Sequence, residues 1–353
     1  MIRLLAIGDM FIPAEYMTAG FKDLADLGVE VTVRQWAHPT LADLQKDNLA
    51  VEQGGCDAVA LPESLIHDVD RFDIISGQFP PIGTALVDRA ANLKVIGVLR
   101  GGTENVAVER ATQKGVCVLN TPGRNARAVA EFTFGMILAE TRNIARAHAA
   151  LKQATWRKSF PNSDYVPEMY GKTVGLVGYG YIGFLVAGYC KAFGCNVIAY
   201  DPYFQGDASP AKLVDLDTLL KTSDVVSIHA RLTDESYHMI GADQLARMKP
   251  NAVLVNSARS GLVDEKALIE ALRAKRIKGA AIDVFDTEPL PQDHPFVAEL
   301  DNVLLTPHLA GTTKDAFFGS PRLMCAHLIN LIKGTGKLPI VNGVPAPKLT
   351  SGN

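Results

Sequence analysis

The sequence predicts an α/β protein whose parallel strands are covered by helices. Two observations support this fold class. In both halves of the 353-residue chain, short runs rich in Val, Ile and Leu alternate with helical stretches, which is the order of elements in parallel sheets. In the second half, a glycine-rich turn also joins an apolar strand directly to an apolar helix, as expected where a helix packs back onto such a sheet.

The first third of the chain contains six strand candidates. They read LLAIG, VEVTVRQW, DAVAL, DIIS, KVIGVL and VCVLN in chain order. Helices are expected over residues 14–27 and 84–91, where apolar residues recur at helical spacing. This alternation predicts one parallel sheet with helices on its faces.

A second alternation begins at residue 172 and predicts a second sheet. A long helical pattern over residues 128–151 precedes it, and a loop rich in Pro, Asn and Ser follows at residues 160–167. The strand candidates are then TVGLVG, NVIAYD, VVSIH, AVLVN, GAAID and NVLLT. After residue 336 prolines recur, and we expect a mostly irregular tail.

Composition limits the classes of function. The chain has 48% hydrophobic and 21% charged residues and a formal net charge of −3, which indicates about two globular domains without a basic face for nucleic acid. The first apolar stretch is too short for a signal peptide, and the uncharged residues 174–190 include five glycines, so no membrane segment is expected. The five cysteines form no CxxC pair, which favours free thiols in a reducing, cytoplasmic setting and argues against a zinc site.

The sharpest local signal is GYGYIG, which contains the pattern GxGxxG. We expect Gly178 to permit a tight turn, Gly180 to let the backbone approach a pyrophosphate, and Gly183 to let helix and strand pack closely. The N–H groups of Tyr181 and Ile182 would then face the phosphates at a helix N-terminus. Between an apolar strand and an apolar helix, this pattern predicts a Rossmann-type dinucleotide-binding fold.

A correctly spaced acid completes the signal. Asp201 closes the next strand candidate, 18 residues after Gly183, where a carboxylate accepts hydrogen bonds from the adenosine ribose and repels a 2′-phosphate. Pro202 and Tyr203 add no cation. NAD is therefore the expected cofactor, in preference to NADP.

Three strand candidates of the second half each end in a residue that can do chemistry. AVLVN is followed by Arg259, GAAID by Asp286 and Glu288, and NVLLT by His308. Because ligands bind outside the carboxyl ends of parallel strands, these exits should lie at one edge with the glycine loop. A solvated loop would explain each residue taken singly, but together they predict an active site.

In these motifs the sequence resembles the D-isomer-specific 2-hydroxyacid dehydrogenases, in their phosphoglycerate dehydrogenase-like branch. The resemblance extends over nearly the whole chain and rests on VGLVGYGYIG, VNSARSGLVDEKAL, DVFDTEPLP, TPHLAGTT and NTPGRNARAVAEFT. It implies a flavodoxin-like substrate-binding domain made of residues 1–121 and 307–353, with a Rossmann NAD-binding domain inserted at residues 122–306. It also implies a homodimer, and hydride transfer between NAD(H) and C2 of a small D-2-hydroxy acid or 2-keto acid.

The resemblance also implies roles for individual residues. Arg259 would bind the substrate carboxylate and polarise the carbonyl with its planar fork of donors. His308, whose side chain type titrates near neutral pH, would exchange a proton with the substrate oxygen while Glu288 orients it. Asp283 matches a residue that binds the nicotinamide side, whereas Asp286 matches no family role and is expected at the surface.

Further contacts are expected at the same edges. We assign His229, Ser257 and Ala258 to the cofactor. In the first half, VLRGGTENV matches the loop whose backbone N–H groups hold the substrate carboxylate, and this indicates Gly101 and Gly102.

Three positions depart from the family's pattern. Arg100, counted here among the substrate-binding candidates, stands where small residues are common and is either a second anion contact or a surface cation. Ala107 replaces a frequent Asp. Arg231 stands where proline is usual and either tunes cofactor contacts or lies in solvent.

Other functions remain open on the sequence alone. 3-Phosphoglycerate is disfavoured because SGQFPP lacks the arginines that neutralise its phosphate in the enzymes that use it, but phosphite dehydrogenases use a similar triad. Glu288 speaks against formate dehydrogenases, which pair the histidine with glutamine. An NAD-sensing corepressor of the same fold is the alternative from another class, and it would bind NADH without reducing any keto acid.

Overall fold

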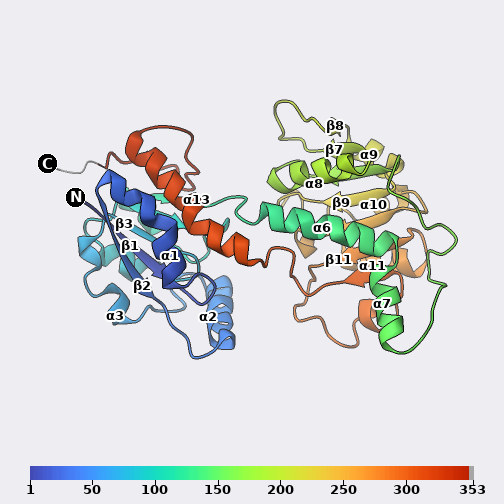
Figure 1. The fold of residues 1–353 in the computed structure, drawn as a ribbon, viewed down its shortest axis with the longest axis horizontal. Helices are drawn as coiled ribbons and strands as arrows, with labels where there is room; N and C mark the ends of the chain where they lie inside the picture. The colour runs from blue at the N-terminus through green and yellow to red at the C-terminus, as the bar shows by residue number, and fades with distance from the viewer. Residues whose placement is uncertain (350–353) are drawn as a thin grey trace. The chain divides into compact units, whose positions relative to one another are not determined.

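The computed structural model describes residues 1–349, and these fall into two compact units (Figure 1). The terminal unit joins residues 1–124 to the segment that begins at residue 313, and the central unit comprises residues 125–312. Each unit is built around its own parallel sheet. The predicted α/β class is therefore confirmed.

The terminal unit contains a five-stranded sheet with the strand order β2-β1-β3-β4-β5, the order of flavodoxin-like folds. Its strands are β1 (Ile2–Gly8), β2 (Val29–Gln35), β3 (Ile74–Gly77), β4 (Val95–Val98) and β5 (Cys117–Leu119). Its α-helices are α1 (Ala14–Phe21), α2 (Leu41–Gly54), α3 (Glu63–Ile66), α4 (Thr84–Arg89), α5 (Val108–Gln113) and α13 (Lys314–Lys333).

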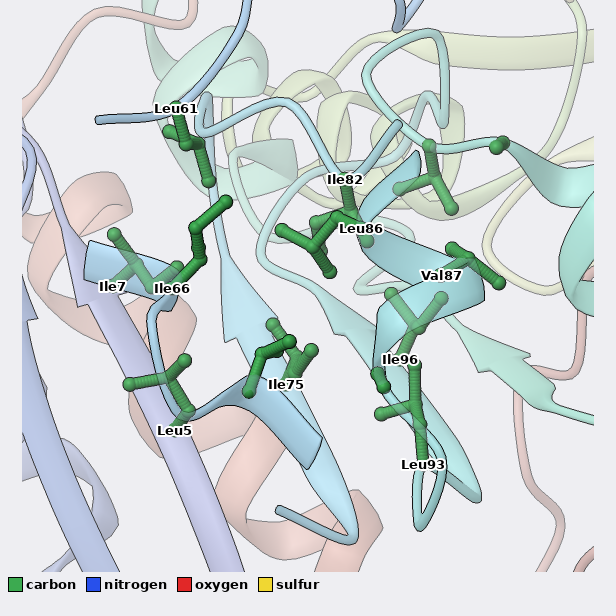
Figure 2. Packing of buried hydrophobic residues seen from close by; sticks show 14 of the residues in the cluster. Leu5, Ile7, Leu61, Ile66, Ile75, Ile82, Leu86, Val87, Leu93 and Ile96 are labelled. Carbon is green, nitrogen blue, oxygen red and sulfur yellow. The ribbon is translucent and has the colours of Figure 1, made fainter. Parts of the chain in front are cut away.

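Both faces of this sheet are covered. Helices α1 and α13, which come from opposite ends of the sequence, pack side by side on one face (Figure 1). On the other face, Leu5, Ile75 and Ile96 project from β1, β3 and β4 into a buried cluster that α3 and α4 close with Ile66 and Leu86 (Figure 2). Double coverage explains why these strands read as nearly continuous apolar runs.

The central unit contains a seven-stranded sheet with the order β12-β11-β10-β9-β6-β7-β8, in which β6 to β11 follow the doubly wound Rossmann arrangement. The strands are β6 (Thr173–Val177), β7 (Asn196–Tyr200), β8 (Lys212–Leu213), β9 (Val225–Ile228), β10 (Val253–Asn256), β11 (Gly279–Ile282) and β12 (Val303–Leu305). The helices are α6 (Ala126–Thr141), α7 (Ile144–Lys152), α8 (Tyr181–Ala192), α9 (Leu216–Thr222), α10 (Ala242–Arg247), α11 (Glu265–Arg273) and α12 (Pro295–Ala298).

Two predicted elements were wrong. The segment DAVAL forms no strand: Leu61 is buried and Val59 packs against the same core, but their neighbours are exposed and pair with no strand. The helix predicted over residues 128–151 is two helices, because Asn143 adopts a left-handed conformation with a φ of 57°. Its side-chain amide donates to Asn162 Oδ1 at 2.6 Å, so a distant partner stabilises the break.

Candidate active site

The three glycines of GYGYIG have three different surroundings. Gly178 has a φ of 95°, and a Cβ there would lie 2.5 Å from the backbone N of Ala230. A Cβ on Gly183 would lie 2.4 Å from the carbonyl oxygen of Gly178. A Cβ on Gly180 would meet no protein atom within 4 Å. Gly178 and Gly183 are therefore needed for packing, whereas Gly180 keeps open the space in front of helix α8.

An open cleft of about 600 Å³ lies along this space. Asp201 stands at its edge, after β7, and its carboxylate accepts hydrogen bonds from the N–H groups of Tyr179 at 2.8 Å and Tyr203 at 2.9 Å. Arg231 also lines the cleft, which places it beside the expected cofactor position. The lining residues are Val177, Gly178, Gly180, Tyr200, Asp201, Pro202, Tyr203, His229, Ala230, Arg231, Thr233, Glu235, Ser236 and Met239.

His229 follows β9, the strand next to β6 at which the strand order reverses. Its Nε2 lies 2.9 Å from Ser227 Oγ, and its Nδ1 is buried without a hydrogen-bond partner in the described residues. Burial lowers the pKa of this imidazole to about 3, so the ring is neutral at physiological pH. His229 also lines the cleft, and the cofactor contact expected of it stays a prediction.

The exits of β10, β11 and β12 lie at one edge of the sheet. These strands are consecutive neighbours and parallel, with Asn256 paired to Ile282 and Ile282 to Leu305 at their last residues. Arg259, Glu288 and His308 follow the three strands in that order. The predicted common edge for these exits is confirmed.

His308 and Glu288 form a direct pair across two of these exits. The Nδ1 of His308 lies 2.9 Å from Glu288 Oε2, and Glu288 Oε1 accepts the N–H of Phe285 at 3.0 Å. Half of the His308 side chain is exposed. A carboxylate accepts only, so Nδ1 must carry a proton, and Nε2 is the nitrogen that can exchange a proton with a ligand.

Arg259 lies in a loop that its neighbours fix. The buried amide of Asn256 donates to the carbonyl oxygen of Arg259 at 2.9 Å and accepts the N–H of Ala258 at 3.0 Å. The guanidinium of Arg259 is exposed and donates from Nη1 to the carbonyl oxygen of Ala258 at 2.7 Å. Most of its five N–H groups therefore remain for an anionic ligand.

Comparison with known families now decides the identity of this fold. A family model described as "D-isomer specific 2-hydroxyacid dehydrogenase, NAD binding domain" matches residues 134–310. The chain belongs to this family of dehydrogenases. NAD is therefore the cofactor of the matched domain, as the glycine loop and Asp201 predicted.

Two curated relatives indicate the range of the family. The chain is 42% identical over 288 residues to a glyoxylate reductase of Thermofilum pendens, covering 79% of this chain and 84% of that protein. It is 38% identical over 292 residues to a D-3-phosphoglycerate dehydrogenase of Archaeoglobus fulgidus, covering 81% of this chain but 54% of the relative. The chain thus spans about half the length of the phosphoglycerate dehydrogenase that it matches.

A solved structure of the family agrees over both units. The NAD-complexed D-isomer specific 2-hydroxyacid dehydrogenase of Lactobacillus delbrueckii ssp. bulgaricus is 26% identical, with a TM-score of 0.75. The match covers 96% of this chain and all of that one. The family's fold therefore accounts for nearly the whole sequence.

The side chain of Asp283, predicted to bind the nicotinamide side of the cofactor, makes several contacts inside the protein. Its side chain is fully buried, and Oδ1 accepts the hydroxyl of Thr306 at 2.6 Å and the N–H of Leu309 at 2.9 Å, while Oδ2 accepts the N–H of Ala310 at 3.0 Å. The carbonyl oxygen of Asp283 also accepts the N–H of His308 at 2.9 Å. The carboxylate therefore holds the loop that carries His308 and presents no exposed atom to a cofactor.

Two other residues that the sequence analysis considered differ in their burial. Ser257 is 7% exposed and its hydroxyl lies 2.6 Å from Thr133 Oγ1, so its side chain stabilises α6 against β10. Asp286 is exposed, as expected of a surface charge. Sequence reasoning gave no role to Thr133 or Asn256, although both lie in the quoted motifs. Only the fold brings Thr133 to Ser257, whereas Asn256 acts on its sequence neighbours Ala258 and Arg259.

The loop around Gly101 and Gly102, predicted to hold the substrate carboxylate, is fixed by a hydrogen bond from the segment after β5. Asn120 donates to the carbonyl oxygen of Gly101 at 2.6 Å. Neither Gly101 nor Gly102 has an acceptor for its backbone N–H within residues 1–349. Arg100 is no isolated surface cation, because it forms ion pairs with Glu104 at 3.1 Å and Glu52 at 3.6 Å.

Within residues 1–349, no helix combines the length and the hydropathy that crossing a bilayer requires.

Proposed function

We propose that this chain is an NAD-dependent dehydrogenase that interconverts a small D-2-hydroxy acid and its 2-keto acid. The observation that carries the proposal is the pair of His308 and Glu288, in which Nε2 of His308 is left for a ligand. The pair follows β12 and β11, and the neighbouring strand β10 leads to the exposed guanidinium of Arg259. The glyoxylate reductases and D-3-phosphoglycerate dehydrogenases among the relatives support the same substrate class.

The residues of the central unit fit the cofactor. Gly180 leaves room in front of helix α8, the first N–H groups of that helix at Tyr181 and Ile182 are free for phosphate oxygens, and Asp201 suits a ribose. Bound NADH would supply the hydride, which is delivered to C2 of the keto acid.

The chain's own residues would supply binding and the proton. Arg259 would hold the substrate carboxylate with guanidinium N–H groups and draw electron density from the carbonyl. Protonated His308 would donate from Nε2 to the carbonyl oxygen as it becomes a hydroxyl, and Glu288 would hold the ring while it carries charge. For the terminal unit taken by itself, we propose the backbone N–H groups of Gly101 and Gly102, which have no acceptor within residues 1–349, as donors to an anion. In the oxidative direction the same Nε2 would accept the proton.

The first test is NADH oxidation by purified protein across a panel of 2-keto acids. The panel comprises glyoxylate, hydroxypyruvate, pyruvate, branched and aromatic keto acids, and phosphohydroxypyruvate. We expect His308→Gln to lower kcat by about 10²- to 10⁴-fold and to leave the NADH affinity within about twofold, as measured by fluorescence titration. His67→Gln, an exposed histidine directly after α3 in the terminal unit, is the matched control.

Each outcome separates the alternatives. Turnover that both His308→Gln and Arg259→Gln abolish supports the proposal, and the best substrate gives the size of the pocket. Binding of NADH without reduction of any keto acid would contradict it and favour a binding protein that senses NAD. Turnover that His308→Gln leaves intact would remove this residue from the mechanism.

A homodimer is part of the same proposal. Three exposed apolar side chains, Ile144, Leu151 and Phe184, lie on α7 and α8 of the central unit and support it. Sedimentation equilibrium of the wild type should give twice the 38.0 kDa chain mass, and a monomer mass would reject the dimer.

A further inference from the structure

The segment of the central unit that carries Glu288 is held by side chains. Residues 284–290 follow β11 and form neither helix nor strand, and none of their backbone groups hydrogen-bonds to another backbone group within residues 1–349. Two N–H groups of this segment have side-chain acceptors. Glu288 itself accepts the N–H of Phe285, and a residue outside the segment accepts the N–H of Asp286. That second acceptor therefore contributes to the position of Glu288.

The acceptor is Glu265, the first residue of α11. Its Oε2 accepts the N–H of Asp286 at 3.2 Å. Helix α11 comes after β10 and the loop of Arg259, and its start is fixed by Asp264, whose side chain accepts the N–H of Ala267 at 3.1 Å. Glu265 thus ties the segment after β11 to the helix that follows β10.

The other carboxylate oxygen of Glu265 binds a histidine farther along the chain. Oε1 lies 3.1 Å from Nε2 of His294. The Nδ1 of this ring accepts the N–H of Phe296, so that His294 is the N-cap of α12. A ring nitrogen that accepts carries no proton, and His294 is therefore protonated at Nε2 and donates to Glu265. Both side chains are 15% exposed, so water competes little for these bonds.

This second acid–histidine pair differs from the pair of His308 and Glu288 in its use of the ring. The Nδ1 of His308 faces Glu288 at 2.9 Å, which leaves Nε2 for a ligand. Both ring nitrogens of His294 are bound inside the protein. Its contacts join both ends of residues 286–294, the stretch that contains Glu288, to one side chain of α11. This arrangement indicates a role in positioning.

We propose that Glu265 and His294 position Glu288 and, through it, the imidazole of His308. Glu265 fixes Asp286, two residues before Glu288, and His294 holds the carboxylate of Glu265 in the orientation that does so. This inference rests on the proposed function and adds two positioning residues to it. Both act through Glu288, so neither is a catalytic residue.

Two substitutions at one position separate this role from that of the helix cap. The Oδ1 of Asn takes the place of histidine Nδ1, so His294→Asn keeps the acceptor for Phe296 and removes the donor to Glu265. The Nε2 of Gln takes the place of histidine Nε2, so His294→Gln keeps that donor and removes the cap. Arg273→Gln is the matched control, because it removes an exposed contact of 3.1 Å between α11 and Glu299 at the end of α12.

The variants should differ in kcat with the best keto acid. His294→Asn should lower kcat by about 10-fold, because a shift of the segment by a fraction of 1 Å misplaces Glu288. The KM of the keto acid and the affinity for NADH should stay within about twofold, since neither ligand loses a contact. His294→Gln and Arg273→Gln should change kcat by less than about twofold. A larger loss for His294→Gln than for His294→Asn would show that the helix cap matters and the positioning pair does not.

A double-mutant cycle tests whether the effect passes through Glu288. In a Glu288→Ala background, His294→Asn should change kcat by less than about twofold, because the group that it positions is already absent. The same loss in this background as in the wild type would overturn the inference, since His294 would then act on the fold or on another group.

Amide hydrogen exchange separates this inference from the proposed function, because it needs no substrate. A peptide that covers residues 284–290 should exchange faster in His294→Asn than in the wild type, and His294→Gln should match the wild type. If the wild type reduces no keto acid, this difference still supports the positioning of the segment. Equal exchange in all three proteins would reject the inference. Faster exchange in His294→Asn with an unchanged kcat would also reject it, because the reaction would then not depend on how the segment is held.

Discussion

Replacing Asp283 by Asn tests whether this residue positions His308 or contacts the cofactor. The wild-type carboxylate accepts three hydrogen bonds inside the protein, from Thr306, Leu309 and Ala310. An Asn side chain can keep the two bonds to Oδ1 with its carbonyl oxygen. Its NH₂ group then faces the N–H of Ala310, so that two donors meet where no water can intervene.

The expected loss of stability follows from these contacts. One charge-assisted hydrogen bond is lost in a buried position, and the other two become neutral bonds, which together should cost about 2–4 kcal/mol of unfolding free energy. His308 has a φ of 53°, a conformation that costs of order 1 kcal/mol and persists only when its surroundings hold it. Relaxation of this loop should displace the imidazole and lower kcat by about 10- to 100-fold.

The assay combines urea unfolding, turnover with the best keto acid and fluorescence titration with NADH. Asp286→Asn, an exposed neighbour on the same loop, is the matched control and should change the unfolding free energy by less than about 0.5 kcal/mol. We expect Asp283→Asn to keep the NADH affinity within about twofold. Unchanged stability together with a large loss of NADH affinity would refute the reasoning and make Asp283 a cofactor ligand.

Three further predictions concern the loop, the pH and a buried ion pair. Gly180→Ala should weaken NADH binding in a titration with little loss of stability, whereas Gly183→Ala should destabilise the fold in urea, because only the second Cβ meets protein atoms. The pKa of Asp9 is about 6 in the fold instead of 3.8, so the unfolded chain releases this proton first as the pH rises. Stability should fall by about 2 kcal/mol between about pH 4 and about pH 6, and urea titrations of Asp9→Asn should lack this component. Glu140 is 2% exposed and bound to Arg146 at 2.8 Å and 3.0 Å. Arg146→Met removes this partner and should lower the unfolding free energy in urea by about 3–5 kcal/mol. Adding Glu140→Gln should restore part of this loss.

Local patterns were enough for the architecture and for the residues with a fixed spacing. Gly178 and Gly183 were predictable because a Cβ at either position would meet backbone atoms of the turn or of the adjacent strand exit. The strand exits were read correctly because parallel strands must end at one edge. The break at Asn143 was missed, since the distant Asn162 and not local propensity stabilises it. The DAVAL segment was missed because its apolar residues pack against the core without pairing with a strand.

The sequence by itself determined the fold class, the dinucleotide loop with Asp201, and the candidate triad of Arg259, Glu288 and His308. Only the tertiary structure decided that the side chain of Asp283 points into the protein and that Arg100 forms ion pairs with Glu104 and Glu52. The physical reason is that a spacing pattern records which groups a chain carries and on which face they lie. Whether a charge is free for a ligand depends on its hydrogen-bond and ion-pair partners, and these come from segments that are distant in sequence.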